Sequence, residues 1–308
     1  MRRLVPLAAL LVGGLFAAIV VPGSPLLSQL LSAISGPAPR ALPARNADPR
    51  ASGRPLRVAV GAMISPERTY QHYREVFEEI ALRRGRPLEL VQRSTYRDLN
   101  NLVEEGEIDL AWICTGAWPE LASAGAARIV AVPRVKGVSS YRAYIIVRAE
   151  NRSRSLSDLR AETFAFTDPL SLTGCEYPLA RLRDRGETAA KFFSHTYYTH
   201  GHDVSIEAVR RGYANAASVD SLVFDFLASR SPREVDGLRI LETSSPFPIP
   251  PLVVPARAEG READDLVTEL LRLADDEGGR RLLGRIGVEA FVRPDSAVYA
   301  RLQAAPRP

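Results

Sequence analysis

The sequence predicts an α/β fold built on two doubly wound sheets, and three observations support this. Its 308 residues are enough for two domains, and 46% hydrophobic with 25% charged residues is an ordinary globular composition. From Leu56 onward, short strand-like runs alternate with helical runs. Because a parallel crossover between strands needs a connecting helix, this alternation indicates parallel sheets with helices on their faces.

The first group of elements is expected to form one lobe. Strands are predicted at residues 56–61, 88–91, 108–113 and 128–132, from runs of β-branched and aliphatic residues. One helix is predicted to start at Ser65-Pro66, with proline in its first turn, and another at Thr95. Tyr73 and Phe77 recur at helical spacing and are assigned to the core.

The second group is expected to form another lobe and then return. A strand at 141–147 is the predicted crossing into this lobe, whose further strands end at Phe166, near Tyr197 and at Val219. Residues 245–251 hold four prolines, so they predict an extended connector and exclude a helix there. The helix predicted at 264–274 is expected to pack back on the first lobe.

Two polar strand-to-helix turns are the strongest candidates for a binding site. Ser171 and Thr173 fall where the first N–H groups of a helix have no carbonyl partner, so this turn offers amides, hydroxyls and the positive end of a helix dipole. The stretch 197–205 repeats the plan, with Gly201 before a helix that starts at about His202. Such helix ends bind anions. Simple helix capping by Ser171 or Thr173 is the commoner alternative.

With these turns the chain resembles the solute-binding proteins of phosphate, phosphite and phosphonate ABC importers, the PhnD-like family. The motifs that carry the resemblance are Asp168-Pro169-x-Ser171-x-Thr173-Gly174, Gly201-His202-Asp203 with Ala208-Val209, and Ala216-Ala217-Ser218-Val219-Asp220-Ser221. It extends from about Leu56 to about Leu302. The resemblance implies a two-lobed periplasmic-binding-protein fold of type II, in which two crossover segments join the two sheets. Lobe 1 would comprise residues 56–139 and 243–308, and lobe 2 residues 140–242, closing on a ligand like a hinge.

The resemblance also implies which residues bind a phosphorus oxyanion. They are Ser171, Leu172, Thr173 and Gly174 of the first turn, His202 of the second, and Tyr96, Tyr141, Thr115 and Asp220 around them. The residue types leave other roles open: strand packing for Tyr141, a surface position for Tyr96, a strand end for Thr115 and a helix cap for Asp220. An imidazole at a helix start can also serve as a local turn partner, and His200 is the natural control for His202.

The ligand class is narrowed by one departure from the resemblance. Aminoalkylphosphonate binders of the family hold the amine with acidic residues, where this chain has Leu222 and Pro251. The departure favours phosphate, phosphite or a simple alkylphosphonate. Asp220 could accept a hydrogen bond from a P–OH group and thereby reject sulfate.

Residues 1–35 are expected to be a signal peptide or an N-terminal membrane anchor. Met1-Arg2-Arg3 precedes an uncharged apolar run at residues 4–21, which is about the minimum length for spanning a bilayer. Residues 36–55, rich in Pro, Ala and Arg, are predicted to be a flexible tether. Either interpretation places the folded part in the periplasm or another extracytoplasmic compartment, anchored to the inner membrane if residues 4–21 are retained.

The excess of basic residues lies in this N-terminal part of the chain. Residues 1–54 hold six Arg and one Asp, a net charge of +5, and the remainder holds 34 basic and 35 acidic residues, a net charge of −1. The charge is therefore poor evidence for nucleic-acid binding, and no nucleic-acid partner is expected.

We therefore expect a monomeric, non-enzymatic protein that captures a phosphorus oxyanion and delivers it to the permease of an ABC importer. No cofactor or metal is expected, because Cys114 and Cys175 lack His or Cys partners at metal-ligand spacing. The two are expected to be buried free thiols, with a bridge between them as the alternative. Two other functions stay open: a membrane-anchored ligand sensor or scaffold of the same fold, and a hydrolase using Ser171 and His202. The hydrolase lacks a Gly-x-Ser-x-Gly elbow.

Overall fold

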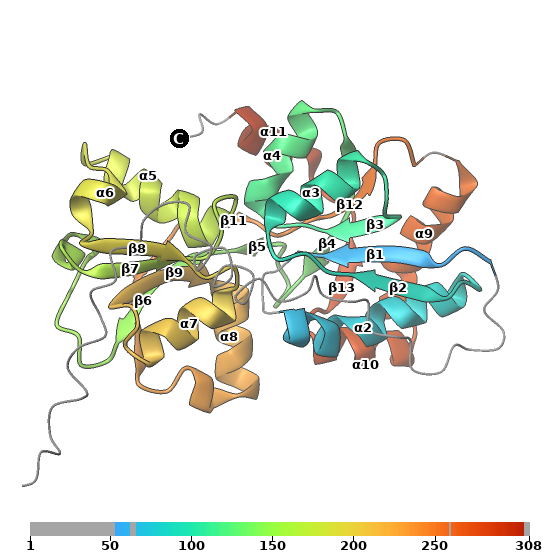
Figure 1. The fold of residues 1–308 in the computed structure, drawn as a ribbon. Coiled ribbons are helices and arrows are strands. Elements are labelled where there is room, and N and C mark those ends of the chain that lie inside the picture. The colour runs from blue at the N-terminus through green and yellow to red at the C-terminus, as the bar shows by residue number, and fades with distance from the viewer. Residues whose placement is uncertain (1–52, 62–65, 259, 305–308) are drawn as a thin grey trace, which may run out of the picture. The chain divides into compact units, whose positions relative to one another are not determined.

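The computed structural model describes residues 53–61, 66–258 and 260–304. The predicted leader at 1–35, and the predicted tether as far as residue 52, lie outside the described residues. Within the described part, no helix combines the length and the apolar character that crossing a bilayer requires. Two main sheets organise this part of the chain (Figure 1).

The six-stranded sheet and its helices are called lobe 1, and its strand order is β13-β4-β12-β3-β1-β2. Its strands are β1 (Leu56–Val60), β2 (Leu88–Val91), β3 (Leu110–Trp112), β4 (Ala127–Arg134), β12 (Leu252–Pro255) and β13 (Ala290–Val292). β1 pairs in parallel with β2 and β3, whereas β12 runs antiparallel between β3 and β4. Its helices are α2 (Pro66–Arg83), α3 (Tyr96–Glu104), α4 (Trp118–Ser123), α9 (Arg261–Arg272), α10 (Glu277–Arg285) and α11 (Ser296–Ala304).

The five-stranded sheet and its helices are called lobe 2, and its strand order is β10-β6-β9-β7-β8. Its strands are β6 (Ala143–Arg148), β7 (Thr163–Phe166), β8 (His195–Tyr198), β9 (Ala216–Asp220) and β10 (Leu238–Thr243). β7 pairs in parallel with β8 and β9, whereas β6 runs antiparallel to β9 and β10. Its helices are α5 (Tyr177–Arg183), α6 (Ala189–Phe192), α7 (His202–Arg210) and α8 (Ser221–Arg230).

The antiparallel strands correct the predicted parallel sheets. β6 and β12 are the strands by which the chain enters each lobe from a connector. Ala143 therefore pairs with Asp220, the last residue of β9, and Leu252 pairs with Trp112, the last residue of β3. The rule that links β/α alternation to parallel pairing applies to strands joined through a helix, and these two strands arrive from the other sheet.

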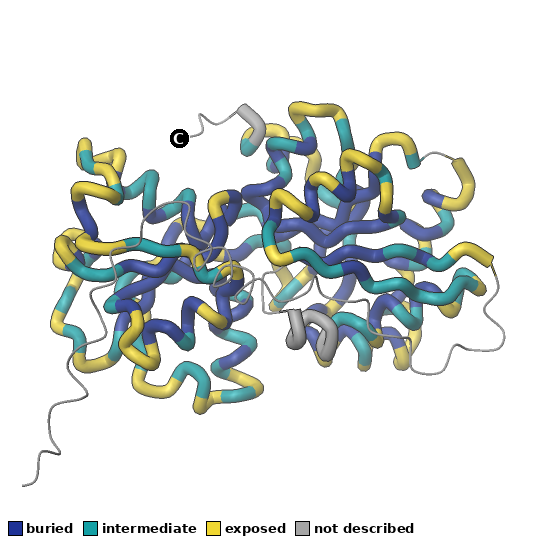
Figure 2. The backbone as a smooth tube through the Cα atoms, viewed as in Figure 1, coloured by how far each residue is buried: buried dark blue, intermediate teal, exposed yellow. Residues whose placement is uncertain are grey.

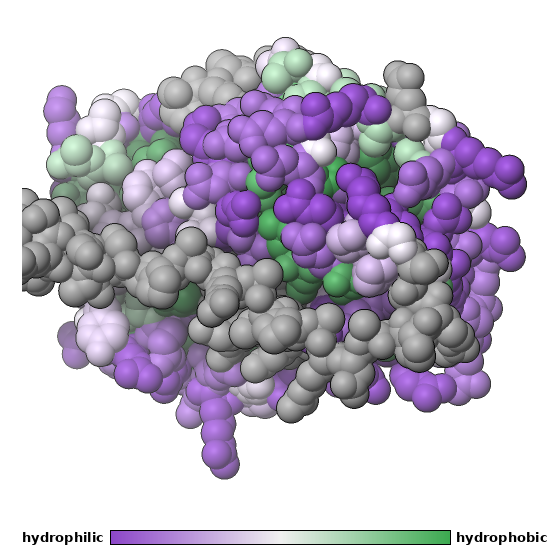
Figure 3. Space-filling view, turned by 45° about the vertical axis from the view of Figure 1, so that its right-hand side comes forward, coloured by the Kyte–Doolittle hydropathy of each residue, from purple (hydrophilic) through white to green (hydrophobic). Residues whose placement is uncertain are grey.

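Both faces of each sheet are covered, because successive side chains of a strand point to opposite sides. Val58 and Val60 of β1 belong to one buried cluster, and Ala59 between them belongs to another. Figure 2 shows the central strands of both sheets as largely buried, whereas the edge strands β2, β8 and β10 are partly exposed. The surface in Figure 3 is mostly hydrophilic, with hydrophobic atoms visible deeper between the polar side chains.

The chain passes twice between the lobes through paired connectors. β5 (Ser140–Tyr141) and β11 (Phe247–Pro248) form a two-stranded antiparallel sheet in which Tyr141 faces Phe247. The proline-rich stretch is extended there, as predicted. The hydroxyl of Tyr299 in α11 donates to the carbonyl of Ile249 at 2.5 Å, so the last described helix braces this connector.

Candidate functional site

The first predicted turn begins as a π-helical turn, Leu172–Glu176, before α5. Ser171 caps it, since its Oγ accepts a hydrogen bond from the amide of Gly174 at 3.0 Å and its carbonyl accepts one from Glu176 at 2.9 Å. The Ser171 side chain therefore acts as a helix cap, which was the alternative to ligand binding. The amide of Leu172 is directed at the thiol of Cys114, whose pKa it acts to lower.

Gly174 is required by packing. A Cβ at this position would lie 2.4 Å from Oγ1 of Thr167 and 2.9 Å from Oγ of Ser171. Thr173 beside it is fully buried, and its carbonyl accepts a hydrogen bond from Oγ of Ser218 at 2.5 Å. Its own hydroxyl makes no hydrogen bond of good geometry among the described residues, although it lies close enough to the Tyr141 hydroxyl to act to lower that group's pKa. The Thr173 hydroxyl is therefore an open hydrogen-bonding group in the interior.

The second predicted turn places His202 at the start of α7 with its ring buried. Nδ1 lies 3.1 Å from the amide nitrogen of Asp220 and 3.1 Å from Oγ1 of Thr167. Because an amide N–H can only donate, Nδ1 must accept, so the neutral ring carries its proton on Nε2. Burial lowers the pKa of His202 to about 3, which keeps the ring neutral. His202 thus offers one donor, Nε2–H.

His200 is placed differently from His202. Its backbone has a positive φ of 57°, and its side chain is 44% exposed. Its Nδ1 lies 3.6 Å from Oδ2 of Asp168. His200 is therefore a turn residue with an accessible ring, which suits it as a control.

Three buried hydroxyls that make no hydrogen bond of good geometry lie near one another: those of Tyr96, Tyr141 and Thr173. Tyr96 opens α3 in lobe 1 and Tyr141 lies in the connector strand β5; they are only 2% and 3% exposed. The surface alternative for Tyr96 is therefore wrong. Burial raises the pKa of both phenols, and Cys114 and Asp220 raise it further in both. A buried hydroxyl without a partner costs about 1–3 kcal/mol, so three together indicate a place built for a polar guest.

Asp220 ends β9 and caps α8, with Oδ1 accepting from the amide of Leu222 at 2.6 Å. Burial raises the pKa of this carboxyl to about 7, partly offset by the amides of Leu222 and Val223. Near neutral pH the carboxyl therefore exists in both protonation states. It can either donate or accept a hydrogen bond.

Thr115 lies shortly after the end of β3, in the 3-10 turn Thr115–Ala117, and it is fully buried. Its hydroxyl donates to the carbonyl of Pro248 at 2.9 Å, in the second connector. Burial raises the pKa of Tyr141, and Thr115 and Thr173, which both lie near its hydroxyl, act to lower it. The structure therefore ties Thr115 first to the connector.

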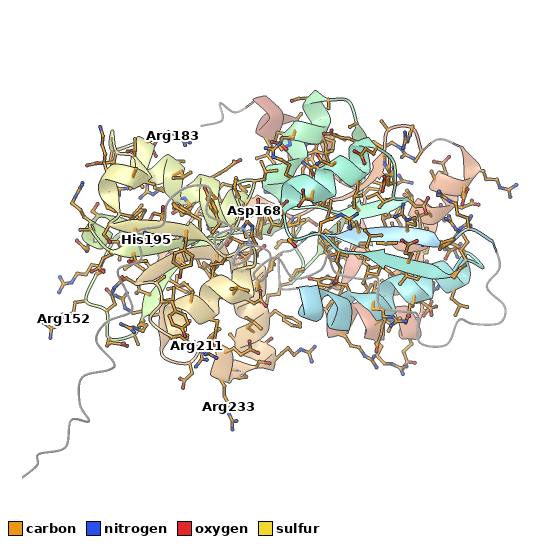
Figure 4. All side chains as sticks on the ribbon, in the orientation of Figure 1. Arg152, Asp168, Arg183, His195, Arg211 and Arg233 are labelled. Atoms are coloured by element: carbon orange, nitrogen blue, oxygen red, sulfur yellow. The ribbon has the colours of Figure 1, made fainter. Side chains whose placement is uncertain are left out.

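The two lobes contact each other next to these candidate site residues, at two places that sequence reasoning missed. The amide of Tyr96 donates to Oδ2 of Asp168 at 3.2 Å, and Asp168 is buried. Figure 4 labels Asp168 where lobe 2 adjoins lobe 1. A Cβ on Gly116 would lie 2.3 Å from the carbonyl of Leu170 and 2.6 Å from the amide of Leu172. Only glycine permits this approach. The sequence signal that could have indicated this approach is Gly116, which directly follows Thr115 after β3.

Neither cysteine is bridged, and both are buried. Burial raises the pKa of Cys114 to about 12 and that of Cys175 to about 11, so both thiols are protonated at neutral pH. Among the described residues, no group of three or more His, Cys, Asp or Glu side chains is arranged to hold a metal ion.

Comparison with known proteins places this geometry among extracytoplasmic binding proteins. A family model described as the periplasmic substrate-binding protein of phosphonate ABC transporters matches residues 58–299. A binding protein component of an ABC phosphonate transporter from Pseudomonas aeruginosa is similar, with a TM-score of 0.76 and 17% identity over 82% of this chain and 85% of that one.

Two further solved structures are similar over most of their length. PhnD1 from Prochlorococcus marinus in complex with methylphosphonate gives a TM-score of 0.73 and 15% identity, covering 81% of this chain and 96% of that one. An ATP-bound protein from Xanthomonas citri gives a TM-score of 0.64 and 19% identity, and the match covers 81% of this chain and 95% of that one. At these identities the likeness concerns the fold, which is the two-lobed type II fold of periplasmic binding proteins.

Proposed function

Because the chain belongs to the family of periplasmic substrate-binding proteins of phosphonate ABC transporters, we propose that it captures a small phosphorus oxyanion between its lobes. The oxyanion is phosphate, phosphite or a phosphonate, and the protein delivers it to the permease of an ABC importer. In this proposal residues 56–139 with 243–308 and residues 140–242 move as two bodies, the protein acts as a monomer in the periplasm, and it does no chemistry on the ligand.

The observation that carries the proposal is the set of three buried hydroxyls without partners, on Tyr96, Tyr141 and Thr173. They come from lobe 1, a connector and lobe 2, so a ligand that satisfies all three holds the lobes together. Each unmade hydrogen bond is costly in the interior, and a ligand with several acceptors removes all three costs.

A phosphoryl group fits the donors around this place. Its oxygens accept hydrogen bonds from neutral groups on several sides: the three hydroxyls and Nε2–H of His202. Asp220, with a pKa of about 7, can accept from a P–OH group or donate to a P–O⁻ group. Ser171, Leu172, Gly174 and Thr115 are proposed to shape the pocket by fixing the turn and the connector. The methylphosphonate bound by PhnD1 from Prochlorococcus marinus supports this ligand class.

The geometry argues against the hydrolase alternative. A serine nucleophile needs a base that accepts its proton. Nδ1 of His202 is occupied by the amide of Asp220, and Nε2 carries the ring proton, so His202 has no free lone pair for this task. Among the described residues, Ser171 and His202 share no hydrogen bond.

A ligand screen by thermal unfolding tests the proposal. Phosphate, phosphite, methylphosphonate, 2-aminoethylphosphonate and sulfate are added separately at increasing concentration. A ligand at one hundred times its Kd stabilises the folded protein by about 2.7 kcal/mol, which corresponds to a rise in Tm of roughly 5–10 °C for a domain of this size. We expect such a rise with a phosphorus oxyanion and none with sulfate.

Variants separate specific binding from a general salt effect. Ser171→Ala combined with Thr173→Ala should abolish the rise, whereas His200→Ala, the matched control on an accessible ring, should keep it. A wild-type protein that responds to no phosphorus oxyanion, or that releases a product from phenyl phosphate with turnover, would refute the proposal.

A further inference from the structure

A cavity of about 580 Å³ adjoins the proposed oxyanion site. Tyr141 and Asp220, two residues of that site, are among its lining residues, so the cavity begins where the site ends. It continues along α8 of lobe 2 on one side and along residues 286–288 of lobe 1 on the other. A substituent on the bound head group would therefore have space to extend between the lobes.

The walls of this cavity are largely apolar and aromatic. Lobe 1 contributes Tyr73, Trp112, Ile286 and Val288, and lobe 2 contributes Tyr144, Leu222, Val223 and Phe226. The rings of Tyr73 and Trp112 pack edge to face with centroids 5.2 Å apart, which fixes one wall. Such walls favour an uncharged substituent, because an ammonium group would lose its hydration there.

The charged side chains at the cavity already have protein partners. Nζ of Lys136 lies 3.4 Å from Oδ2 of Asp225, and this ion pair joins lobe 1 to lobe 2. Arg230 donates to the carbonyl of Gly284 at 2.8 Å, again from lobe 2 to lobe 1. Arg142 donates to the carbonyl of Ser244. The one remaining carboxyl, Asp220, caps α8 and belongs to the head-group site.

The size of the cavity exceeds what the smallest ligands need. A water molecule takes up about 30 Å³ in the liquid, so 580 Å³ corresponds to about twenty waters. Pockets of roughly 300–1,000 Å³ hold ligands of several rings or comparable chains. A methyl substituent would leave most of this apolar space filled with water, and a ring or a chain of several carbons would displace that water.

We propose that the ligand is a phosphonate with an uncharged apolar substituent of at least ring size, an aryl or longer alkyl phosphonate, and that its substituent fills this cavity. This rests on the proposed function, because the head group must first bind at the hydroxyl cluster. The substituent contacts side chains of both lobes, so its burial adds to the closure that the head group begins. Leu222 and Val138, which line the cavity without belonging to the head-group site, select for the substituent.

Isothermal titration of four ligands tests this assignment on the wild-type protein. The ligands are methylphosphonate, phenylphosphonate, hexylphosphonate and 2-aminoethylphosphonate, which share a head group and differ in the substituent. We expect phenylphosphonate and hexylphosphonate to bind at least tenfold more tightly than methylphosphonate, equivalent to about 1.4 kcal/mol. We expect 2-aminoethylphosphonate to bind no more tightly than methylphosphonate. Equal or tighter binding of methylphosphonate than of phenylphosphonate would overturn the inference.

Two variants that reduce the cavity localise the effect. Val138 is 53% exposed, and Leu222 is half-buried on α8 beside the cluster of Val132, Ile249 and Tyr299, so tryptophan at either place can extend into the space. Leu222→Trp and Val138→Trp should each weaken phenylphosphonate at least tenfold and leave methylphosphonate within about twofold. Leu82→Trp is the matched control, since Leu82 is 43% exposed on α2 and does not line the cavity.

The outcomes distinguish the two proposals. If no phosphonate binds the wild-type protein, the proposed function fails. If methylphosphonate binds, but phenylphosphonate binds no more tightly or is unaffected by both cavity variants, the head-group site stands and the substituent pocket is refuted. Circular dichroism and unliganded Tm show whether each variant folds, and because Val138 is exposed, its variant keeps the test decisive if Leu222→Trp is unstable.

Discussion

Replacing Thr173 by valine should have opposite effects on the stability of the free protein and on its affinity for ligand. Valine has nearly the same shape as threonine but lacks the hydroxyl, and in Thr173 that hydroxyl is fully buried without a partner. Removing an unsatisfied buried hydroxyl recovers about 1–3 kcal/mol of desolvation cost. The same change removes a hydrogen bond to a charged ligand, which contributes about 1.5–3 kcal/mol, or roughly 10- to 150-fold in Kd.

Thr167 provides the matched control, because it is equally buried and makes hydrogen bonds. Its Oγ1 lies 3.1 Å from Nδ1 of His202 and 3.3 Å from Oγ of Ser205. Thr167→Val should therefore destabilise the free protein by about 1–3 kcal/mol, because its partners lose a bond.

Denaturant unfolding without ligand and titration calorimetry with methylphosphonate measure the two quantities separately. The expected pattern is a more stable, weaker-binding Thr173→Val protein beside a less stable Thr167→Val protein. If Thr173→Val destabilises the free protein as much as Thr167→Val does, or leaves the ligand Kd unchanged, then the Thr173 hydroxyl is not an open group awaiting a ligand.

Two further predictions concern pH and closure. Asp220 has a folded-state pKa of about 7 against an ordinary value of 3.8, so its carboxyl ionises in the unfolded chain at lower pH than in the folded protein. As pH rises from about 4 to 7, the stability of the wild type should therefore fall relative to that of Asp220→Asn by up to about 4 kcal/mol, and above pH 7 the difference should stay constant. Urea unfolding of both proteins across this range checks this, and a constant difference between them would contradict it. Gly116→Ala should weaken ligand binding at least tenfold and reduce ligand-induced compaction in small-angle scattering, because its Cβ would lie 2.3 Å from the carbonyl of Leu170. Gly284→Ala, whose Cβ meets nothing within 4 Å, should behave like wild type, and equal behaviour of the two variants would show that the approach at Gly116 does not control closure.

The sequence predicted the parts of the fold that depend on local chemistry. The start of α3 after Thr95 and the cap of α8 at Asp220 follow from residue types at helix ends, and both are confirmed. The extended connector follows from its prolines. Each of these features depends on neighbours within a few residues, which a single sequence contains.

The features that the sequence missed depend on contacts between distant segments. The π-helical start at Leu172 accommodates Gly174 against Thr167, and the antiparallel direction of β6 and β12 depends on where the chain crosses between sheets. Residue type alone could not tell that the Ser171 hydroxyl is occupied while the Thr173 hydroxyl is open. That difference arises from the path of the turn in three dimensions.

The pairing of β5 with β11 has a practical consequence for measuring the protein at work. If the lobes close as proposed, two connectors bonded side by side should bend together. Because Tyr299 also fixes one of them through Ile249, twisting of one lobe against the other should be resisted more than bending. A swing about one axis can be followed with a single pair of fluorophores, one in each lobe. If the protein binds and closes as proposed, such labels would report the bound ligand in real time, with a signal proportional to the fraction of molecules loaded.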